Sequence, residues 1–255
     1  MDEALLSRIE DAGLNASAPP QQRWLDGWLL RYLPGKARRA RCINALMPGR
    51  QPVAHKLALA EAQYQQAGLP PIFRITRFTA ADTQEAWLQQ QGFDWLDPTD
   101  IMACGDLPSD DEVPLPPGAE WLALGPQDFA EAVGALRGTP PAHRETHAQR
   151  LQWSPVPYRG FALRWRDDGL ILACGQFARE ADLVGLYDVF THPQSRNQGL
   201  SQLLCKRLLS IAAHEGARQA YLQVEHENHA AQSVYRRLGF AVVDGYHYRQ
   251  RPASV

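Results

Sequence analysis

A proline-rich, acidic stretch in the middle of the chain sets the strongest limit on how it can fold. The segment from Leu107 to Gly118 reads LPSDDEVPLPPG and holds four prolines and three acidic residues. Proline lacks a backbone N–H and fixes its own φ, so such a stretch sustains neither a helix interior nor a central strand. We therefore expect two domains, residues 1–107 and 119–255, with residues 108–118 as the linker.

Composition excludes several classes of protein. The 255 residues carry 26 Lys and Arg against 28 Asp and Glu, a formal charge of −2, and the pI is near 6.4. This balance lacks the basic footprint of a dedicated nucleic-acid binder. No apolar run approaches the roughly 18–20 residues of a membrane-spanning helix, and Met1 to Ala4 lack the features of a signal peptide. We expect a cytoplasmic protein without nucleic-acid or membrane partners.

The four cysteines, Cys42, Cys104, Cys174 and Cys205, lie far apart in the sequence. No C-x-x-C pair exists, and no pair of Cys or His has the spacing of zinc ligands, so the sequence predicts no metal site. In a cytosolic protein we expect the cysteines to be buried thiols.

The C-terminal domain alternates helix-like and strand-like patterns. Periodicity and turn residues predict strands at 121–124, 160–165, 170–177, 183–191, 221–225 and 241–248, and helices at 126–136, 141–152, from Gly199 onward and at 230–238. Asp168-Gly169 between two apolar runs indicates a hairpin. The expected fold class is α/β (α+β), with a mixed, mainly antiparallel sheet flanked by helices.

The N-terminal domain repeats part of this order. It is predicted to have a helix at 53–66, a strand at 72–75 and a helix at 81–90. Gly68 to Gly92, around the strand and second helix, spans 24 positions, and Gly216 to Gly239 in the C-terminal domain spans 23. A shared order with a shared period suggests a degenerate internal duplication.

The segment between the expected strand at 183–191 and the following helix has the character of an anion site. Pro193 stops the strand, and Gly199, without a Cβ, lets a ligand approach the backbone. The first N–H groups of a helix have no intrahelical partner, and the helix dipole adds positive charge there. This suits a pyrophosphate, although the segment is neither a P-loop nor a G-x-G-x-x-G motif.

With this loop the sequence resembles the GNAT superfamily of acyl-CoA-dependent N-acyltransferases. The family's loop, R/Q-x-x-G-x-G/A, stands here as Arg196-Asn197-Gln198-Gly199-Leu200-Ser201, with Ser201 in place of Gly or Ala. A second family signature stands as Asn228, Ala231, Tyr235, Gly239 and Phe240. The resemblance covers about residues 120–250, and the N-terminal half resembles the degenerate first copy of a tandem GNAT protein.

The resemblance implies that acetyl-CoA is a co-substrate and that an amine attacks its thioester directly. Backbone groups of Val189, Phe190 and Thr191 would pair with the pantetheine arm, and the N–H groups from Arg196 to Ser201 would hold the pyrophosphate. Asn228 would bond the pantetheine, and Tyr235 would protonate the departing thiolate. The alternative for Tyr235 is a core position, because aromatic residues at helical spacing usually pack.

The general base is open between several residues. An alkylammonium with a pKa of about 10 must lose a proton before it attacks. Asp188 and Glu225 lie in otherwise apolar strands, where an unpaired carboxylate is costly. Their alternative is a strand-end carboxylate that is exposed or paired with an arginine. His226 is a third candidate for the base.

Two further groups of charged residues have plainer expectations. Lys36, Arg38, Arg39 and Arg41 could meet an anionic substrate, but a solvated hairpin face is favoured. His143 and His147 lie one helical turn apart and are expected to form a surface pair.

The leading function is an N-acetyltransferase acting on the primary amine of a small molecule or of a peptide N-terminus. The alternatives are a non-catalytic acyl-CoA-binding module and an aminoacyl transferase that uses charged tRNA. No phosphate loop precedes the N-terminal helix at 53–66, so we expect one CoA site, in the C-terminal domain. The oligomeric state is left open between monomer and homodimer.

Overall fold

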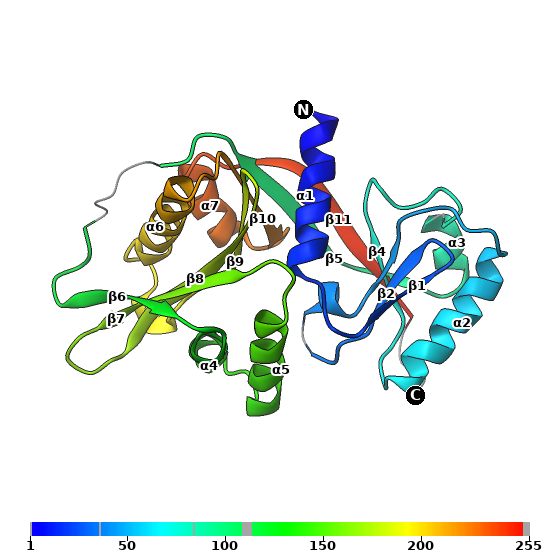
Figure 1. The fold of residues 1–255 in the computed structure, drawn as a ribbon, viewed down its shortest axis with the longest axis horizontal. Coiled ribbons are helices and arrows are strands. Elements are labelled where there is room, and N and C mark those ends of the chain that lie inside the picture. The colour runs from blue at the N-terminus through cyan, green and yellow to red at the C-terminus, as the bar shows by residue number, and fades with distance from the viewer. Residues whose placement is uncertain (1, 36, 84, 109–113, 252–255) are drawn as a thin grey trace. The chain divides into compact units, whose positions relative to one another are not determined.

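The structure is a computed structural model that describes residues 2–35, 37–83, 85–108 and 114–251 (Figure 1). The chain forms two compact units. Unit 1 comprises Met1–Ala16, Ile101–Val224 and Asn228–Asp244, and unit 2 comprises Ser17–Asp100, Glu225–Glu227 and Gly245–Val255. The centre of the expected linker, residues 109–113, lies outside the described residues.

Both ends of the chain are placed differently from the expected division at residues 107 and 119. Helix α1 (Glu3–Ala16) was not predicted from the sequence and belongs to unit 1. Its last carbonyl, that of Ala16, accepts a 2.7 Å hydrogen bond from the Tyr158 hydroxyl. The end of strand β11 (Ala241–Gln250) belongs to unit 2, where it pairs antiparallel with β4 (Ile72–Ile75). Such pairings join distant segments and leave no local pattern in the sequence.

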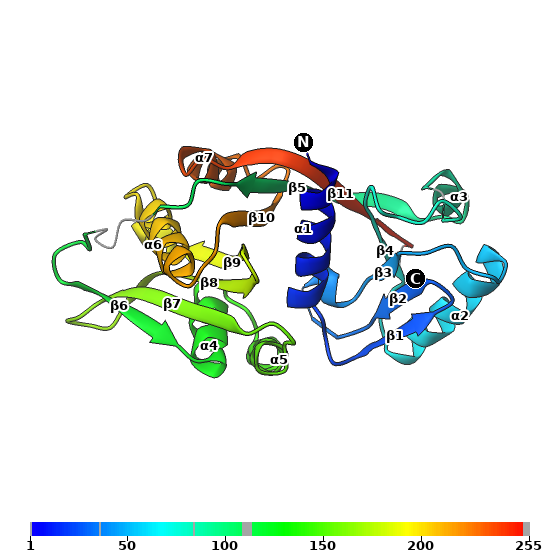
Figure 2. The same cartoon turned by 45° about the horizontal axis from the view of Figure 1, so that its top comes forward.

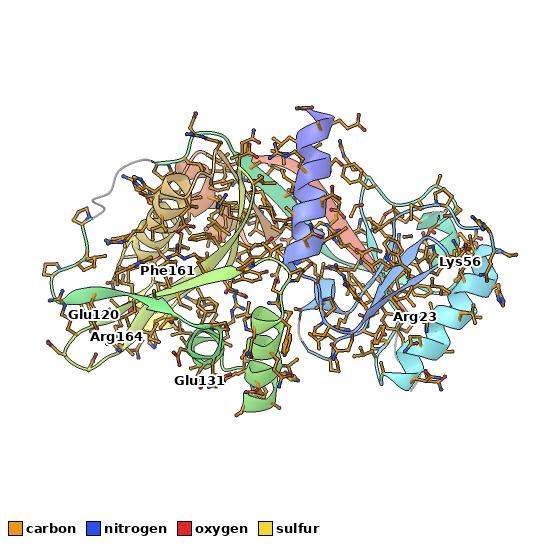
Figure 3. All side chains as sticks on the ribbon, in the orientation of Figure 1. Arg23, Lys56, Glu120, Glu131, Phe161 and Arg164 are labelled. Atoms are coloured by element: carbon orange, nitrogen blue, oxygen red, sulfur yellow. The ribbon has the colours of Figure 1, made fainter. Side chains whose placement is uncertain are left out.

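Unit 1 is built on a mainly antiparallel sheet. Strands β6 (Ala119–Leu124), β7 (Tyr158–Trp165), β8 (Ile171–Glu180) and β9 (Leu183–Thr191) each pair antiparallel with the next, and β10 (Gln219–Glu225) pairs parallel with β9. On the two outer strands Arg164 Nε donates to the opposite Glu120 Oε1 at 2.6 Å (Figure 3). The predicted mixed α/β fold class is confirmed.

Helices cover both faces of this sheet (Figures 1 and 2). Helices α4 (Pro126–Leu136) and α5 (Pro141–Gln152) lie on one side of β8 and β9, and α6 (Leu200–His214) and α7 (His229–Arg237) lie on the other. The α6 side buries a large apolar core with Leu204, Leu208 and Phe177, and the α4 side a smaller one with Phe129 and Val133.

Unit 2 has a second sheet with its own core. Its strands are β1 (Gln22–Leu25), β2 (Trp28–Arg31), β3 (Ile43–Ala45), β4 and the end of β11, and only the β3–β4 pair is parallel among the pairs described. Helices α2 (Val53–Gln66) and α3 (Glu85–Gln90) bury Leu57, Tyr64 and Leu88 against Trp28 and Phe73. The 3-10 turn η1 (Arg38–Ala40) precedes β3, and β5 (Asp94–Cys104) contributes residues to both units.

Most of the helices predicted from local sequence patterns have the predicted bounds. The helices expected at 53–66, 126–136 and 141–152 have those bounds, whereas α3 begins at Glu85 rather than at residue 81. Just before it, Thr79 Oγ1 accepts from the Thr76 N–H at 2.9 Å and Thr76 Oγ1 from the Phe78 N–H at 3.1 Å. Side-chain bonds of this kind stabilise turns in competition with a helix.

The four cysteines are buried and free, as predicted. In the part of the chain that the structure describes, no helix combines the length and the apolar character needed to cross a membrane.

Candidate active site

Strand β9 changes its geometry in its second half. Phe190 faces Cys174 of β8 and Tyr187 faces Gln176, so Asp188 and Val189 together oppose a single residue of β8. This is a β-bulge, and Asp188 has a φ of 51° within it.

The bulge coincides with the separation of β9 from β10. The parallel ladder runs from Leu183 and Gln219 to Leu186 and Leu222, although β9 continues to Thr191 and β10 to Glu225. The edge of β9 that faces away from β8 is therefore open to an extended ligand beyond the ladder. The predicted pantetheine-binding residues Val189, Phe190 and Thr191 are half-buried and lie at this end.

The predicted phosphate loop follows directly. After the 3-10 turn η2 (Pro193–Ser195), the residues Arg196, Asn197, Gln198 and Gly199 are exposed, and Leu200 and Ser201 form the first turn of α6. Gly199 caps this helix with a φ of 74°, a conformation that glycine adopts without strain. Among the described residues, no side-chain oxygen accepts from the peptide N–H groups from Arg196 to Ser201. The loop therefore presents a row of donors at a helix N-terminus, which suits an anion.

The loop ahead of α2 in unit 2 is closed by the protein's own carboxylates. Asp26 Oδ2 accepts from the N–H groups of Arg50 and Gln51, both at 2.8 Å. Asp82 Oδ2 accepts from the Gly49 N–H at 3.1 Å and from Lys56 Nζ at 3.0 Å. The backbone hydrogen bonds from Arg50 and Gln51 lower the pKa of Asp26. The donors ahead of α2 are thus already engaged.

The side chain of Lys56, which is labelled in Figure 3, completes this arrangement. Its side chain is fully buried, with Nζ 4.7 Å from the ring centroid of Trp28. A buried ammonium requires a charged partner, and Asp82 supplies it. The loop ahead of α2 is therefore held against the core of unit 2 by these contacts and is not an open anion site.

Tyr235 occupies the core position that the sequence left open as its alternative. It lies on α7 with its ring in the core of unit 1, 8% exposed and 6.0 Å from the ring of Phe240. Its hydroxyl makes no hydrogen bond to another residue of the described chain. Burial, helped by nearby Cys205 and opposed by Arg137, raises the pKa of Tyr235 above its usual value near 10. The phenol is therefore a protonated donor at neutral and alkaline pH.

Asp188 lies at the centre of a polar cluster on the α4 side of the sheet. Its Oδ1 accepts from Arg137 Nη1 at 2.8 Å, its Oδ2 accepts from Gln176 Nε2 at 2.8 Å, and His147 Nε2 lies 3.3 Å from Oδ2. Burial acts to raise the pKa of Asp188, but His147, Arg137 and Arg150 outweigh it, so the pKa lies well below its ordinary range. Asp188 is thus a carboxylate paired with an arginine, which was the alternative left open by the sequence.

The other candidate residues lie at the end of β10 and the start of α7. Glu225 is the exposed last residue of β10 and is grouped with unit 2. Asp100, 3.1 Å from His226 Nδ1, raises the pKa of His226 through a hydrogen bond and its charge, which favours the cationic ring over a base. Asn228 Oδ1 caps α7 by accepting from the Ala231 N–H at 3.1 Å, so this part of the second signature is a helix cap. Asn228 is itself exposed.

The sequence model of the Acetyltransferase (GNAT) family matches residues 127–240, which contain β9, the loop and α7. This part of the chain is therefore similar to the GNAT acetyltransferases. The chain is also 25% identical over 232 residues to the uncharacterized N-acetyltransferase YobR of Bacillus subtilis, covering 89% of this chain and 91% of that protein.

Solved structures share the fold of this chain. A GCN5-related N-acetyltransferase from Kribbella flavida superposes with a TM-score of 0.66 at 18% identity, over 97% of this chain and 96% of the other. A tandem GNAT protein from the clavulanic acid biosynthesis pathway gives a TM-score of 0.65 at 13% identity, over 81% and 72% of the two chains. At these identities the likeness concerns the fold alone.

Two expectations about charged residues, one in unit 1 and one in unit 2, were wrong. His147 is not part of a surface pair, because its ring lies against Asp188 and Phe129. The basic cluster is not a solvated face, because Arg38 and Arg41 are half-buried and burial, with the charge of Arg38, lowers the pKa of Arg41. Lys36 lies outside the described residues.

Sequence reasoning missed Arg137, Arg150 and Gln176. Gln176 could have been noticed as a polar residue in the apolar run from Ala173 to Phe177. Arg137 and Arg150 carry no such signal, because arginines at the ends of surface helices are common.

Proposed function

We propose that the chain is an N-acetyltransferase that transfers the acetyl group of acetyl-CoA to a primary amine, with one acetyl-CoA site, in unit 1. The observation that carries this proposal is the continuity between the open edge of β9 and the exposed loop ahead of α6. A strand edge offers backbone groups to the amides of a pantetheine arm, and a helix N-terminus offers donors to a pyrophosphate. Acetyl-CoA would supply the activated thioester.

Each predicted residue has a role in this proposal. Val189, Phe190 and Thr191 pair with the pantetheine through their backbone, and the N–H groups from Arg196 to Ser201 hold the pyrophosphate. The Asn228 NH₂ group donates to the pantetheine, since its oxygen caps α7. Tyr235 Oη gives its proton to the departing sulfur, and its raised pKa keeps that proton in place until then.

The cysteines favour direct attack by the amine. Burial raises the pKa of both Cys174 and Cys205 to about 12. The reactive form of cysteine is the thiolate, so neither thiol carries an acyl group efficiently at neutral pH.

The proton acceptor for the amine is Glu225 in this proposal. Both oxygens of Asp188 already accept hydrogen bonds, and its low pKa makes it a weak base. Glu225→Gln is expected to lower kcat/KM at neutral pH about tenfold or more and to alter the acidic limb of the pH–rate profile. Glu227→Gln, an exposed carboxylate two positions on, is the matched control. An unchanged profile in Glu225→Gln would remove this residue from the proton transfer.

The site for the pyrophosphate can be tested by placing a charge in each loop. Gln198→Glu is expected to weaken acetyl-CoA binding about tenfold, because a carboxylate repels phosphate at a helix N-terminus. Gln51→Glu, the same change beside the closed loop of unit 2, should leave the affinity unchanged. Isothermal titration calorimetry of the full chain measures both affinities and should give one equivalent of acetyl-CoA. Equal effects of the two variants, or a second equivalent, would contradict the single site.

Unit 2 is, in the same proposal, a degenerate GNAT-like copy. Its parallel β3–β4 pair with α2 between repeats the β9–α6–β10 connection of unit 1. The likeness of the chain to a tandem GNAT protein supports the proposal. The carboxylates of Asp26 and Asp82 explain why this copy would not bind CoA.

A further inference from the structure

The polar cluster around Asp188 holds an excess of positive charge. Asp188 interacts with the permanently charged guanidinium groups of Arg137 and Arg150 and with the imidazole of His147. With His147 neutral, one carboxylate faces two arginines, so one positive charge is not balanced within this group. An unbalanced charge in a partly buried environment raises the free energy of the folded chain.

Arg150 is the least satisfied member of the cluster. It is 9% exposed, and its guanidinium carbon lies 5.8 Å from the ring centroid of Tyr158. It makes no hydrogen bond or ion pair to any residue within the described ranges. A guanidinium has five N–H donors and no acceptor, so a buried arginine in this state favours a ligand that brings oxygen atoms.

His147 lies beside Arg150 and shares this feature. The two residues are three positions apart on α5 and so face the same way. His147 Nε2 is buried and has no hydrogen-bond partner within the described structure, although Asp188 Oδ2 is 3.3 Å away. On this face of α5, Arg150 therefore lacks an acceptor, and His147 Nε2 has only the 3.3 Å contact with Asp188.

The cluster adjoins the residues assigned to the acetyl-CoA site. Asp188 directly precedes Val189 at the start of the open edge. The Arg137 guanidinium carbon lies 5.5 Å from the ring centroid of Phe190, and the charge of Arg137 acts on the Tyr235 hydroxyl. An anion bound by these arginines would thus belong to a molecule that reaches the open edge of β9.

Resting on the proposed function, we propose that the acceptor is an amine that also carries a carboxylate, as an amino acid does, and that Arg150 and Arg137 bind this carboxylate. A carboxylate has the single negative charge that balances the cluster, and arginine binds it through two parallel hydrogen bonds. Asp188 is then a positioning residue that fixes Arg137, and Arg150 sets the specificity.

The reaction on such an acceptor balances without a further reagent. The amine nitrogen forms an amide bond with the acetyl carbon while the carbon–sulfur bond breaks. The sulfur takes the proton of Tyr235. Of the two protons that the ammonium group loses, one restores Tyr235 and the other passes to solvent through the base. The product is an N-acetylated carboxylate, and free CoA leaves as a thiol.

Matched pairs of acceptors test this inference. Release of free CoA thiol is measured with each of the proteinogenic L-amino acids and with its carboxamide, which keeps the amine and removes the charge. At least one amino acid is expected to exceed its carboxamide in kcat/KM by about ten- to a hundredfold, the value of a charge-assisted contact. Arg150→Gln should reduce that ratio to about threefold or less, mainly through KM.

Arg159→Gln is the control for the loss of an arginine. This residue is on β7 next to Tyr158, but it pairs with Glu215 and lies over the rings of Phe161 and Phe177 in the α6-side core. It should keep the wild-type preference for the carboxylate. Arg150→Lys keeps the charge without the planar fork and should give an intermediate ratio. This second variant keeps the test decisive if Arg150→Gln fails to fold.

Calorimetric titration of the same pairs into the chain without acetyl-CoA separates this inference from the proposed function. Binding of an amino acid that is lost in its carboxamide and in Arg150→Gln supports the inference even where acetyl-CoA does not bind. Acetyl-CoA binding and turnover with no preference for a carboxylate acceptor would overturn the inference and leave the proposed function intact. No carboxylate preference in either turnover or binding would overturn it as well.

Discussion

Replacing Asp188 by asparagine is expected to lower the free energy of unfolding by about 2–4 kcal/mol, because it removes the anion from a largely buried group of cations. Arg137 would lose its 2.8 Å partner, and Arg150 would lose the charge that offsets its own. Asparagine has nearly the same volume, so the change isolates charge from packing. Equilibrium urea unfolding of the variant measures the effect.

Asp182→Asn is the matched control for this variant. Asp182 pairs with Arg8, but both side chains are more than two-fifths exposed, and exposed pairs contribute at most about 1 kcal/mol. The control should therefore change stability much less than Asp188→Asn.

The pH dependence distinguishes charge from other effects of Asp188→Asn. The pKa of Asp188 is lower in the folded than in the unfolded chain, where it is near 3.9. Its contribution is therefore fully present above about pH 4 and is lost as pH falls through the lower folded value. The difference in stability between wild type and variant should shrink accordingly. A difference that stays constant down to acid unfolding would show that the charge does not cause it.

The parts of the site that are local in sequence could be predicted from it. The end of β9 at Thr191, the turn at Pro193 and the helix after Gly199 depend on neighbouring residues, and the structure has them where they were expected. The bulge at Asp188 could not be predicted, because it requires an extra residue relative to β8 and the sequence of β9 alone does not show which register the pair adopts.

The parts that depend on distant segments could not be predicted. The Asp188 cluster consists of residues from α4, α5, β8 and β9, and these residues come into contact only when the four elements pack against one another. In unit 2 the carboxylates that accept from the N–H groups ahead of α2, those of Asp26 and Asp82, come from other loops than the residues they bind. Similarly, β11 pairs with β4 although most of the chain length separates the two strands in the sequence.

Tyr235→Phe is expected to lower kcat by about 10²–10³-fold while leaving the affinity for acetyl-CoA within about threefold. The ring stays in the core, and the hydroxyl makes no hydrogen bond to any other described residue, so stability should change by less than about 1 kcal/mol. Steady-state kinetics with a saturating acceptor, calorimetry and thermal unfolding measure the three quantities.

Tyr64→Phe gives the opposite pattern and serves as the control. The Tyr64 hydroxyl is buried in unit 2 and donates a 2.6 Å hydrogen bond to the Arg31 carbonyl, so its loss should cost about 1–2 kcal/mol of stability and leave kcat unchanged. The raised pKa of Tyr235 also predicts the pH dependence of kcat in the wild type. An acid donates its proton only below its pKa, so the titration of Tyr235 should cause no fall in kcat up to about pH 10. If Tyr235→Phe retains full turnover, the hydroxyl has no part in the transfer and the departing sulfur must take its proton from elsewhere.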